Sequence, residues 1–212
     1  MSAAILTTRR LNEIARLERV ATSWAAKYVI PTIAGDIESA ASLAYGLGNE
    51  LRGYFAVALW RLKIPVPAFR EYFSNVWIHD HREVIEAAES RRNLRAMFVY
   101  AEFPIPDHLP EKITVWRGTS FLSIEEASRG YSWTTDMDCA CWFAMRFAEK
   151  NGNPLVLGAD VSKKNILFYS NDRNESEVVI FNPKPKLLLF YDDLVEGFEN
   201  HKADKKVIKS NC

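Results

Sequence analysis

Two carboxylates separated by one residue, Glu175 and Glu177, stand directly before the apolar β-branched run Val178-Val179-Ile180. If both glutamates belong to a strand, the alternation of side chains directs both carboxylates to one face. Like charges at that separation weaken a fold unless a cation or a catalytic task retains them. The alternative is a purely structural one, an acidic loop that leads into an ordinary strand, because isolated Glu-x-Glu sequences are common.

Two further clusters fall where predicted strands end. In Val115-Trp116-Arg117-Gly118, a permanently charged planar fork suited to phosphate is followed by a glycine that lets a ligand approach the backbone. In Gly130 to Thr135, Ser132 and Thr134 place hydroxyls at alternate positions just before a predicted helix. Taken singly, such an arginine is commonly a salt-bridge partner, and Ser-x-Thr before a helix is commonly a cap.

The order of these three clusters resembles that of the Arg-Ser-Glu class of mono-ADP-ribosyltransferases, which occur as phage-encoded modifiers and bacterial toxins. The resemblance covers roughly residues 113–191. It implies that the chain splits NAD and transfers ADP-ribose to a macromolecular acceptor, most of all a protein arginine. NAD is then a substrate, no metal is required, and the expected location is the cytoplasm.

The resemblance also implies roles for single residues. Arg117 would contact the phosphates of NAD, and the backbone of Gly118 would pair with the nicotinamide amide. Ser132 would support the nicotinamide ribose and orient the catalytic glutamate. Thr134 stands where the last serine of the family motif usually lies, and Trp133 where its threonine lies, so Ser-Trp-Thr is a variant of that motif.

Glu177 resembles the catalytic glutamate of the family, and Glu175 resembles its partner in arginine-directed members. Breaking the bond between ribose and nicotinamide builds positive charge on the ribose, which a carboxylate on the 2′-hydroxyl stabilises. An arginine acceptor must lose a proton during attack, and its pKa above about 12 calls for a nearby base. We expect Glu175 to be that base, and Phe168 or Tyr169 to stack on the acceptor.

Three other functions stay open. The same fold can modify nucleic acid bases, it can pass ADP-ribose to water as an NAD glycohydrolase, or the chain can be a non-enzymatic interaction domain that does not bind NAD. The 27 basic and 27 acidic residues give a net charge of zero, which argues mildly against nucleic acid. The sequence names no regulatory partner.

The 212 residues, of which 48% are hydrophobic and 25% charged, predict a soluble globular chain with a sizeable core. Three prolines in residues 103–110 mark a boundary. Before it, periodicity predicts a helix that begins at Thr8 and further helices over residues 36–45, 49–62, 68–77 and 82–100. After it, we expect strands over residues 112–116, 130–134, 155–161, 165–169, 177–181 and 187–191, and a helix capped by Thr135 or Asp136.

The predicted fold is α+β. A helical N-terminal lobe (1–110) precedes an NAD-binding core (111–200) and a solvated basic tail (201–212). Few helices lie between the core strands, which favours a mixed, mainly antiparallel sheet. The resemblance adds that this sheet is split, with NAD lying between its halves.

Other candidate sites weaken on inspection. His79 and His81 are metal-ligand types, but residues two apart on a helix face away from each other. Cys139 and Cys141 have the same spacing and indicate packing. The three arginines of 91–95 favour a solvated helix face over a phosphate site. The cysteines suggest a reducing compartment, and no secretory signal or apolar run near 18 residues is present.

Overall fold

The computed structural model describes residues 8–189 and 191–210. The chain divides into two compact units, Met1–Phe103 and Pro104–Cys212. The division therefore falls at the start of the proline-rich segment, whereas the predicted boundary lay at its end.

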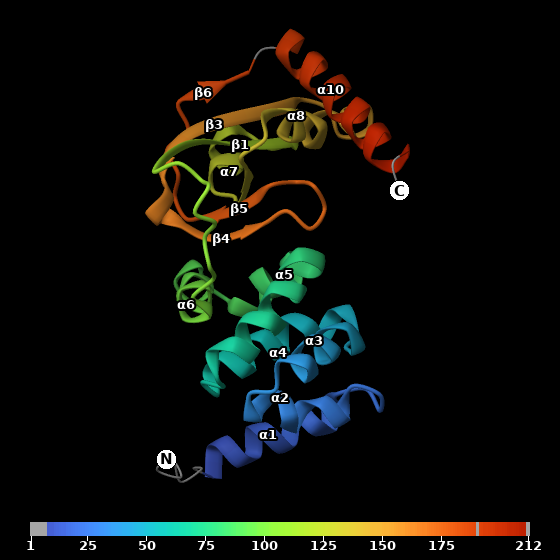
Figure 1. The fold of residues 1–212 in the computed structure, drawn as a ribbon, viewed down its shortest axis with the longest axis vertical. Coiled ribbons are helices and arrows are strands. Elements are labelled where there is room, and N and C mark those ends of the chain that lie inside the picture. Colours follow the sequence, from blue (N-terminus) through green and yellow to red (C-terminus); the bar gives the residue numbers. More distant parts are fainter. Residues whose placement is uncertain (1–7, 190, 211–212) are drawn as a thin grey trace. The chain divides into compact units, whose positions relative to one another are not determined.

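The N-terminal unit is helical (Figure 1). Its elements are α1 (Thr8–Val20), the 3-10 turn η1 (Ala26–Tyr28), α2 (Val29–Ala34), α3 (Ile37–Gly46), α4 (Asn49–Arg61), α5 (Val66–Ala88) and α6 (Arg91–Ala101). The core is rich in aromatic side chains, because Phe69, Phe73 and Trp77 of α5 are all fully buried. The run Phe55 to Leu59 of α4 is buried as well, as expected for a helix that is apolar nearly all round.

The break between α5 and α6 differs from the sequence prediction. Helical backbone continues past Trp77 to Ala88, interrupted only by Asp80, whose carboxylate pairs with Arg52. The predicted helix over 82–100 is instead divided, because Glu89 takes a left-handed conformation and the Ser90 side chain caps α6 by accepting from Asn93 N at 3.1 Å.

The C-terminal unit is built on a six-stranded sheet in the order β4-β5-β2-β1-β3-β6. Every neighbouring pair is antiparallel. The predicted α+β class is confirmed, and the sheet, predicted to be mixed and mainly antiparallel, is antiparallel throughout the described residues. The strands are β1 (Lys112–Ser120), β2 (Ser132–Thr134), β3 (Pro154–Ser162), β4 (Ile166–Ser170), β5 (Glu177–Ile180) and β6 (Leu187–Leu188).

The contact between β1 and β2 is short. β1 pairs with β3 along its whole length, whereas the register between β1 and β2 contains the single pair Trp116 and Thr134. From Arg117 to Ser120, β1 is therefore still paired with β3 but is no longer paired with β2. The two halves of the sheet are joined at this one position.

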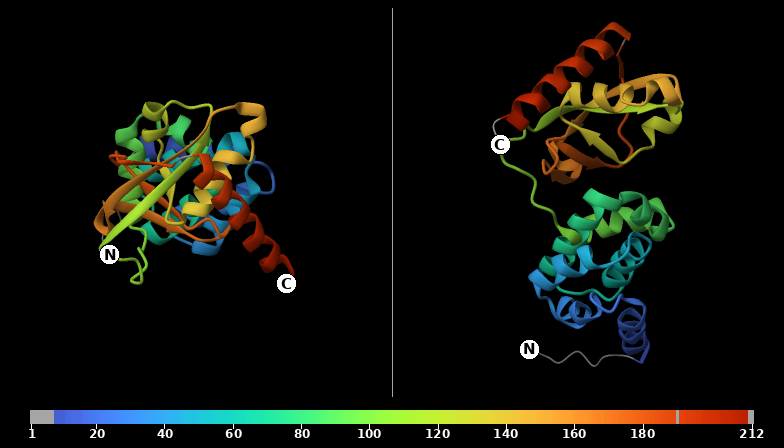
Figure 2. Two further views of the ribbon diagram at one scale, coloured as in Figure 1. Left: turned by 90° about the horizontal axis from the view of Figure 1, so that it is seen from above. Right: turned by 90° about the vertical axis from the view of Figure 1, so that its right-hand side faces the viewer.

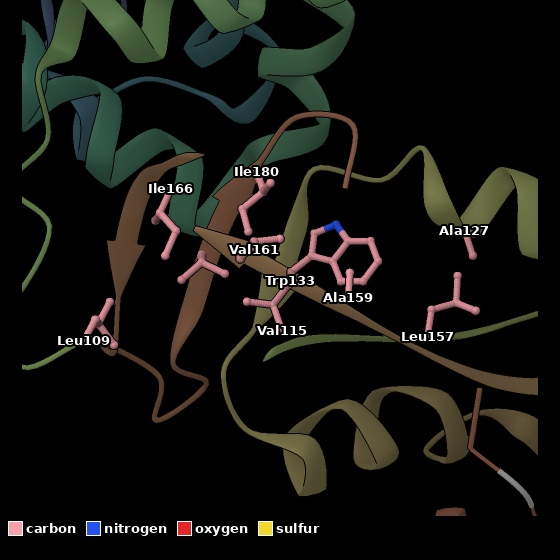
Figure 3. Packing of buried hydrophobic residues seen from close by; sticks show 10 residues of the cluster. Leu109, Val115, Ala127, Trp133, Leu157, Ala159, Val161, Ile166 and Ile180 are labelled. Atoms are coloured by element: carbon pink, nitrogen blue, oxygen red, sulfur yellow. The ribbon is translucent and has the colours of Figure 1, made fainter. Parts of the chain in front are cut away.

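Each face of the sheet carries its own core. On one face Trp133 lies among residues of β1, β3 and β5 and beside Ala127 of α7 (Ile124–Ser128), as Figure 3 shows. On the other face α8 (Met137–Met145) packs through Ala140 and Ala144 against Val156, and α10 (Tyr191–Ser210) lies beside α8 (Figures 1 and 2). The short elements α9 (Ala148–Asn151) and η2 (Lys163–Asn165) complete the unit.

The tail predicted over residues 201–212 is not a separate segment. Residues 201–210 continue helix α10, and the last predicted strand is shortened to Leu187–Leu188. His201 is only 4% exposed and its ring lies 5.6 Å from that of Trp142 in α8. Leu194, Gly197 and His201 recur at helical spacing and face α8, so a narrow stripe holds an otherwise charged helix in place. Residues 211 and 212 of the predicted tail lie outside the described residues.

Candidate functional site

The three clusters singled out in the sequence meet at the point where β1 and β2 separate. β2 lies between β1 and β5, and its last residue, Thr134, stands opposite Trp116 on one side and Glu177 on the other. Arg117, Ser132 and Glu177 therefore come from three neighbouring strands. By the alternation of side chains, Ser132 and Glu177 share the face of Trp116 and Thr134, whereas Arg117 belongs to the other face. Antiparallel pairing in this order brings together residues 60 positions apart in the sequence, Arg117 and Glu177.

Arg117 is bound into this position. Its Nη1 donates to the carbonyl oxygen of Ser132 at 2.5 Å. A methyl group on Gly130 would lie 2.1 Å from Cζ of Arg117, so the guanidinium rests directly on the backbone of Gly130. Burial lowers the pKa of Arg117, and the negative charge of Glu177 opposes that shift. The buried Nε has no hydrogen-bond partner within the described part of the chain.

Gly118 has one face against α8 and its polar backbone directed toward β2. A methyl group here would lie 1.7 Å from the carbonyl oxygen of Ala140, so close helix packing requires glycine. Its partner on β3, Val156, accepts from Leu189 N on the far side at 3.3 Å. Gly118 and Val156 are thus a non-hydrogen-bonded pair, and the N–H and C=O of Gly118 point toward β2, beyond the position where the two strands pair.

The two hydroxyls of the second cluster have different surroundings. Ser132 is half-buried at the start of β2, opposite Val179. Thr134 is only 5% exposed, and its hydroxyl donates to the carbonyl oxygen of Glu175 at 2.7 Å while accepting from Asp136 N at 3.0 Å. This arrangement makes Thr134 a residue that positions the Glu175 to Glu177 segment. Trp133 between them is a core residue whose Nε1 donates to Gly130 O at 3.1 Å.

The strand argument for the two glutamates is wrong for Glu175. β5 begins at Glu177, and Ser176 takes a left-handed conformation with φ +43°, so strict alternation does not extend to Glu175. A loop turn holds this geometry, because the Asn171 side chain accepts from Ser176 N at 3.0 Å and from Ser176 Oγ at 3.2 Å. Glu177 is half-buried and pairs in register with Thr134 and Ser170.

Cations surround the Glu175 carboxylate. Oε2 lies 2.9 Å from Nη2 of Arg173, and the Glu175 side chain is 13% exposed. The charge of Glu175 also acts on Arg146, the C-cap of α8. Burial lowers the pKa of Arg146, and the negative charge of Glu175 opposes that shift. The Glu175 carboxylate thus has one cationic partner, Arg173, and a second cation, Arg146, within electrostatic range.

Arg146 was not identified from the sequence. Its guanidinium lies over the rings of Trp142, Phe143 and Phe147, at 4.6, 4.4 and 5.0 Å from their centroids. The available signal was an arginine three and four residues after two aromatic residues in a predicted helix, a spacing that brings side chains together.

The two aromatic residues expected to contact an acceptor are largely covered by other side chains. Phe168 is 2% exposed and is one of the largest fully buried side chains of the described chain. Tyr169 is half-buried, packs against the Trp133 core and lies edge-on to His108. It stands opposite Val178, on the other face of the sheet from Glu177. The exposed residues next to Glu175 are those of the loop 171–174.

The remaining candidates have ordinary neighbours. The ring of His79 lies against Tyr45 and that of His81 against Trp77. Cys141 is buried against α10, and burial together with nearby aspartates raises the pKa of its thiol to about 11. Within the described ranges, no three His, Cys, Asp or Glu side chains are grouped to hold a metal ion.

In residues 8–189 and 191–210, no helix combines the length and the apolar character needed to cross a membrane. Comparisons with protein-family models, curated proteins and solved structures found no match for this chain.

Proposed function

We propose that the chain is a mono-ADP-ribosyltransferase that cleaves NAD and transfers ADP-ribose to a macromolecule, a protein arginine before other acceptors. The observation that carries this proposal is the placement of Arg117, Ser132 and Glu177 on three neighbouring strands where β1 leaves β2, with Arg117 bonded to the Ser132 carbonyl and sensitive to the charge of Glu177. The same three residues carried the sequence resemblance, and they lie far apart in the chain.

The neighbourhood of Arg117 supports a role in binding NAD. A partly buried guanidinium is costly to retain, and such groups concentrate at functional sites. The diphosphate of NAD supplies the anion that a planar guanidinium fork binds best. Next to Arg117, the N–H and C=O of Gly118 point to the side of β1 where β2 is no longer paired. This N–H can donate to the carbonyl oxygen of a primary carboxamide such as nicotinamide, and this C=O can accept from its NH₂ group.

Glu177 is the proposed catalytic residue. Its carboxylate hydrogen-bonds the 2′-hydroxyl of the nicotinamide ribose. As the C–N bond to nicotinamide breaks and the ribose becomes cationic, the negative charge of Glu177 stabilises the transition state more than the bound substrate. Ser132 and Thr134 hold the strand and loop that carry this carboxylate. No metal takes part in these steps.

Transfer to arginine needs a base for the guanidinium proton, and Glu175 is the carboxylate placed for it. The acceptor would enter beside the exposed loop 171–174 and replace Arg173 as the partner of Glu175. A second candidate follows from this same ion pair. Arg173 pairs with Glu175 and Arg146 lies within its electrostatic range, which makes Glu175 less available as a base for an arginine acceptor. Water then competes as the acceptor, and the chain would act as an NAD glycohydrolase.

The test is incubation of the full chain with NAD labelled in its adenylate portion and a bacterial lysate, followed by separate analysis of protein and nucleic acid. Label on protein that is lost with Glu177→Gln and with Glu175→Gln supports transfer to arginine. Label on nucleic acid, or free ADP-ribose alone, moves the assignment to a base acceptor or to water. Absence of any NAD turnover leaves a non-enzymatic domain.

A further inference from the structure

The N-terminal unit has a cleft whose lining includes none of the residues of the candidate site. It has a volume of about 840 Å³ and lies between α1 and the C-terminal end of α4. Nine described residues line it, and five of them are basic: Arg9, Arg10, Arg16, Arg61 and Lys63. The only acidic residue in this lining is Glu13. In a chain of zero net charge, this is a local concentration of positive charge.

Two carboxylates of the described residues interact with the lining of this cleft. The Glu13 carboxylate accepts a hydrogen bond from Tyr54 at 3.1 Å, and Arg61 pairs with Glu89 at 3.8 Å. Among the described residues, Arg16 and Lys63 form no ion pair with a carboxylate. Each lies over an aromatic ring instead: Arg16 is 5.1 Å from the centroid of Tyr54, and Lys63 is 4.9 Å from that of Trp60. The cleft thus retains positive charge for a ligand.

A further observation points to a ligand. The Nε1 of Trp60 is buried and has no acceptor within the described part of the chain. An indole N–H only donates, so a ligand oxygen in the cleft would satisfy it. Lys63, which follows α4, has a left-handed backbone with φ +51° that ends the helix, because Ile64 N donates to Leu59 O and Lys63 N to Trp60 O.

We propose that this cleft binds phosphate groups, either the phosphodiesters of a single-stranded nucleic acid or the polyphosphate of a nucleotide. Guanidinium groups bind phosphate oxygens through paired hydrogen bonds, and a lysine between them adds a point charge. The volume lies within the range of ordinary ligand pockets, about 300–1,000 Å³. This inference does not depend on the proposed NAD chemistry.

The test measures binding of a fluorescein-labelled single-stranded oligonucleotide to the full chain at low salt by anisotropy, with inorganic tripolyphosphate and poly-glutamate as competitors. The double variant Arg16→Gln/Lys63→Gln should weaken binding at least tenfold. It should also flatten the dependence of log K on log salt by about 1.4, which is about 0.7 for each lost contact. The matched control Arg92→Gln/Arg95→Gln removes two charges from exposed positions of α6 and should leave binding unchanged.

Trp60→Phe keeps an aromatic ring but removes the indole N–H, and it should weaken binding several-fold without changing the salt dependence. Displacement of the oligonucleotide by tripolyphosphate at comparable phosphate concentration identifies the polyphosphate of a nucleotide as the ligand, and weak displacement identifies nucleic acid. The inference is overturned if the wild-type chain binds neither probe, if the double variant binds as the wild type does, or if poly-glutamate competes as well as phosphate.

Discussion

The side chain of Arg117 has three neighbours that fix its place: the carbonyl of Ser132, the backbone of Gly130 and the charge of Glu177. If this guanidinium binds the diphosphate of NAD, an ammonium at the same position cannot supply the planar fork. We therefore expect Arg117→Lys to weaken NAD binding at least tenfold. Titration calorimetry would measure the affinity. The exposed Arg129→Lys is the matched control, and equal affinities of all three proteins would contradict the assignment of Arg117.

Gly118 tests the packing beside that arginine. Since a methyl group at this position would lie 1.7 Å from Ala140 O, Gly118→Ala must push α8 away from β1 or distort the strand. Overpacking of this kind costs about 1–3 kcal/mol, and contact with backbone places this case at the upper end. The free energy of unfolding in urea is the measurement. An unchanged midpoint with an unchanged m-value would show that helix and strand are not so closely packed.

The sequence pattern singled out Arg117, Ser132 and Glu177, and the sheet places them on three neighbouring strands. Their roles stay predictions. The orientation of Glu175 could not be predicted in this way, because it depends on the left-handed Ser176 and on the hydrogen bonds that Asn171 accepts. Positive φ at a non-glycine residue leaves little trace in a sequence.

At the scale of elements, the pKa of one carboxylate, Asp138 of α8, is raised where α8 packs beside α10. Burial raises the pKa of Asp138, and the neighbouring Asp136 adds to the shift. Because the pKa is higher in the folded state, stability is lost as pH rises through the interval between the unfolded value of 3.8 and the folded value. At pH 7 the charged form is therefore disfavoured in the folded protein.

Asp138→Asn should accordingly raise the melting temperature at pH 7, and this gain should shrink toward zero near pH 3. Thermal denaturation at a series of pH values is the measurement. The matched control is Asp192→Asn, an exposed carboxylate in the first turn of the same α10, where negative charge favours the helix. A loss of stability with Asp138→Asn at pH 7 would mean that the carboxylate is held by favourable contacts.

Most helices and strands could be predicted from local sequence patterns. The C-terminal helix could not, because tertiary packing rather than local sequence determines it. The strands from β1 to β5 were predicted because short runs rich in β-branched, other apolar and aromatic residues lie there between turn residues. The C-terminal helix was missed because only Leu194, Gly197 and His201 face α8 and charged residues occupy most of its other positions. Its stability comes from a tertiary contact, which local composition does not report.

At the scale of the whole molecule, the two units have separate cores. Both core clusters of the sheet draw all their members from residues after Pro104, among them Ile105 and Leu109 of the proline-rich segment. We therefore expect a fragment of residues 104–212 to fold by itself and to bind NAD, since Arg117, Gly118 and Glu177 all belong to it. Circular dichroism melting and calorimetric titration would test this. A fragment without a cooperative transition would show that its fold needs the helical unit.

The most direct measurement of the central claim is the release of nicotinamide from NAD by the purified full chain. The account predicts release by the wild type, a rate lower by about 10²–10³ in Glu177→Gln with an unchanged melting curve, and an unchanged rate in Glu196→Gln, which alters an exposed glutamate of α10. No release by the wild type, or full release by Glu177→Gln, would contradict it.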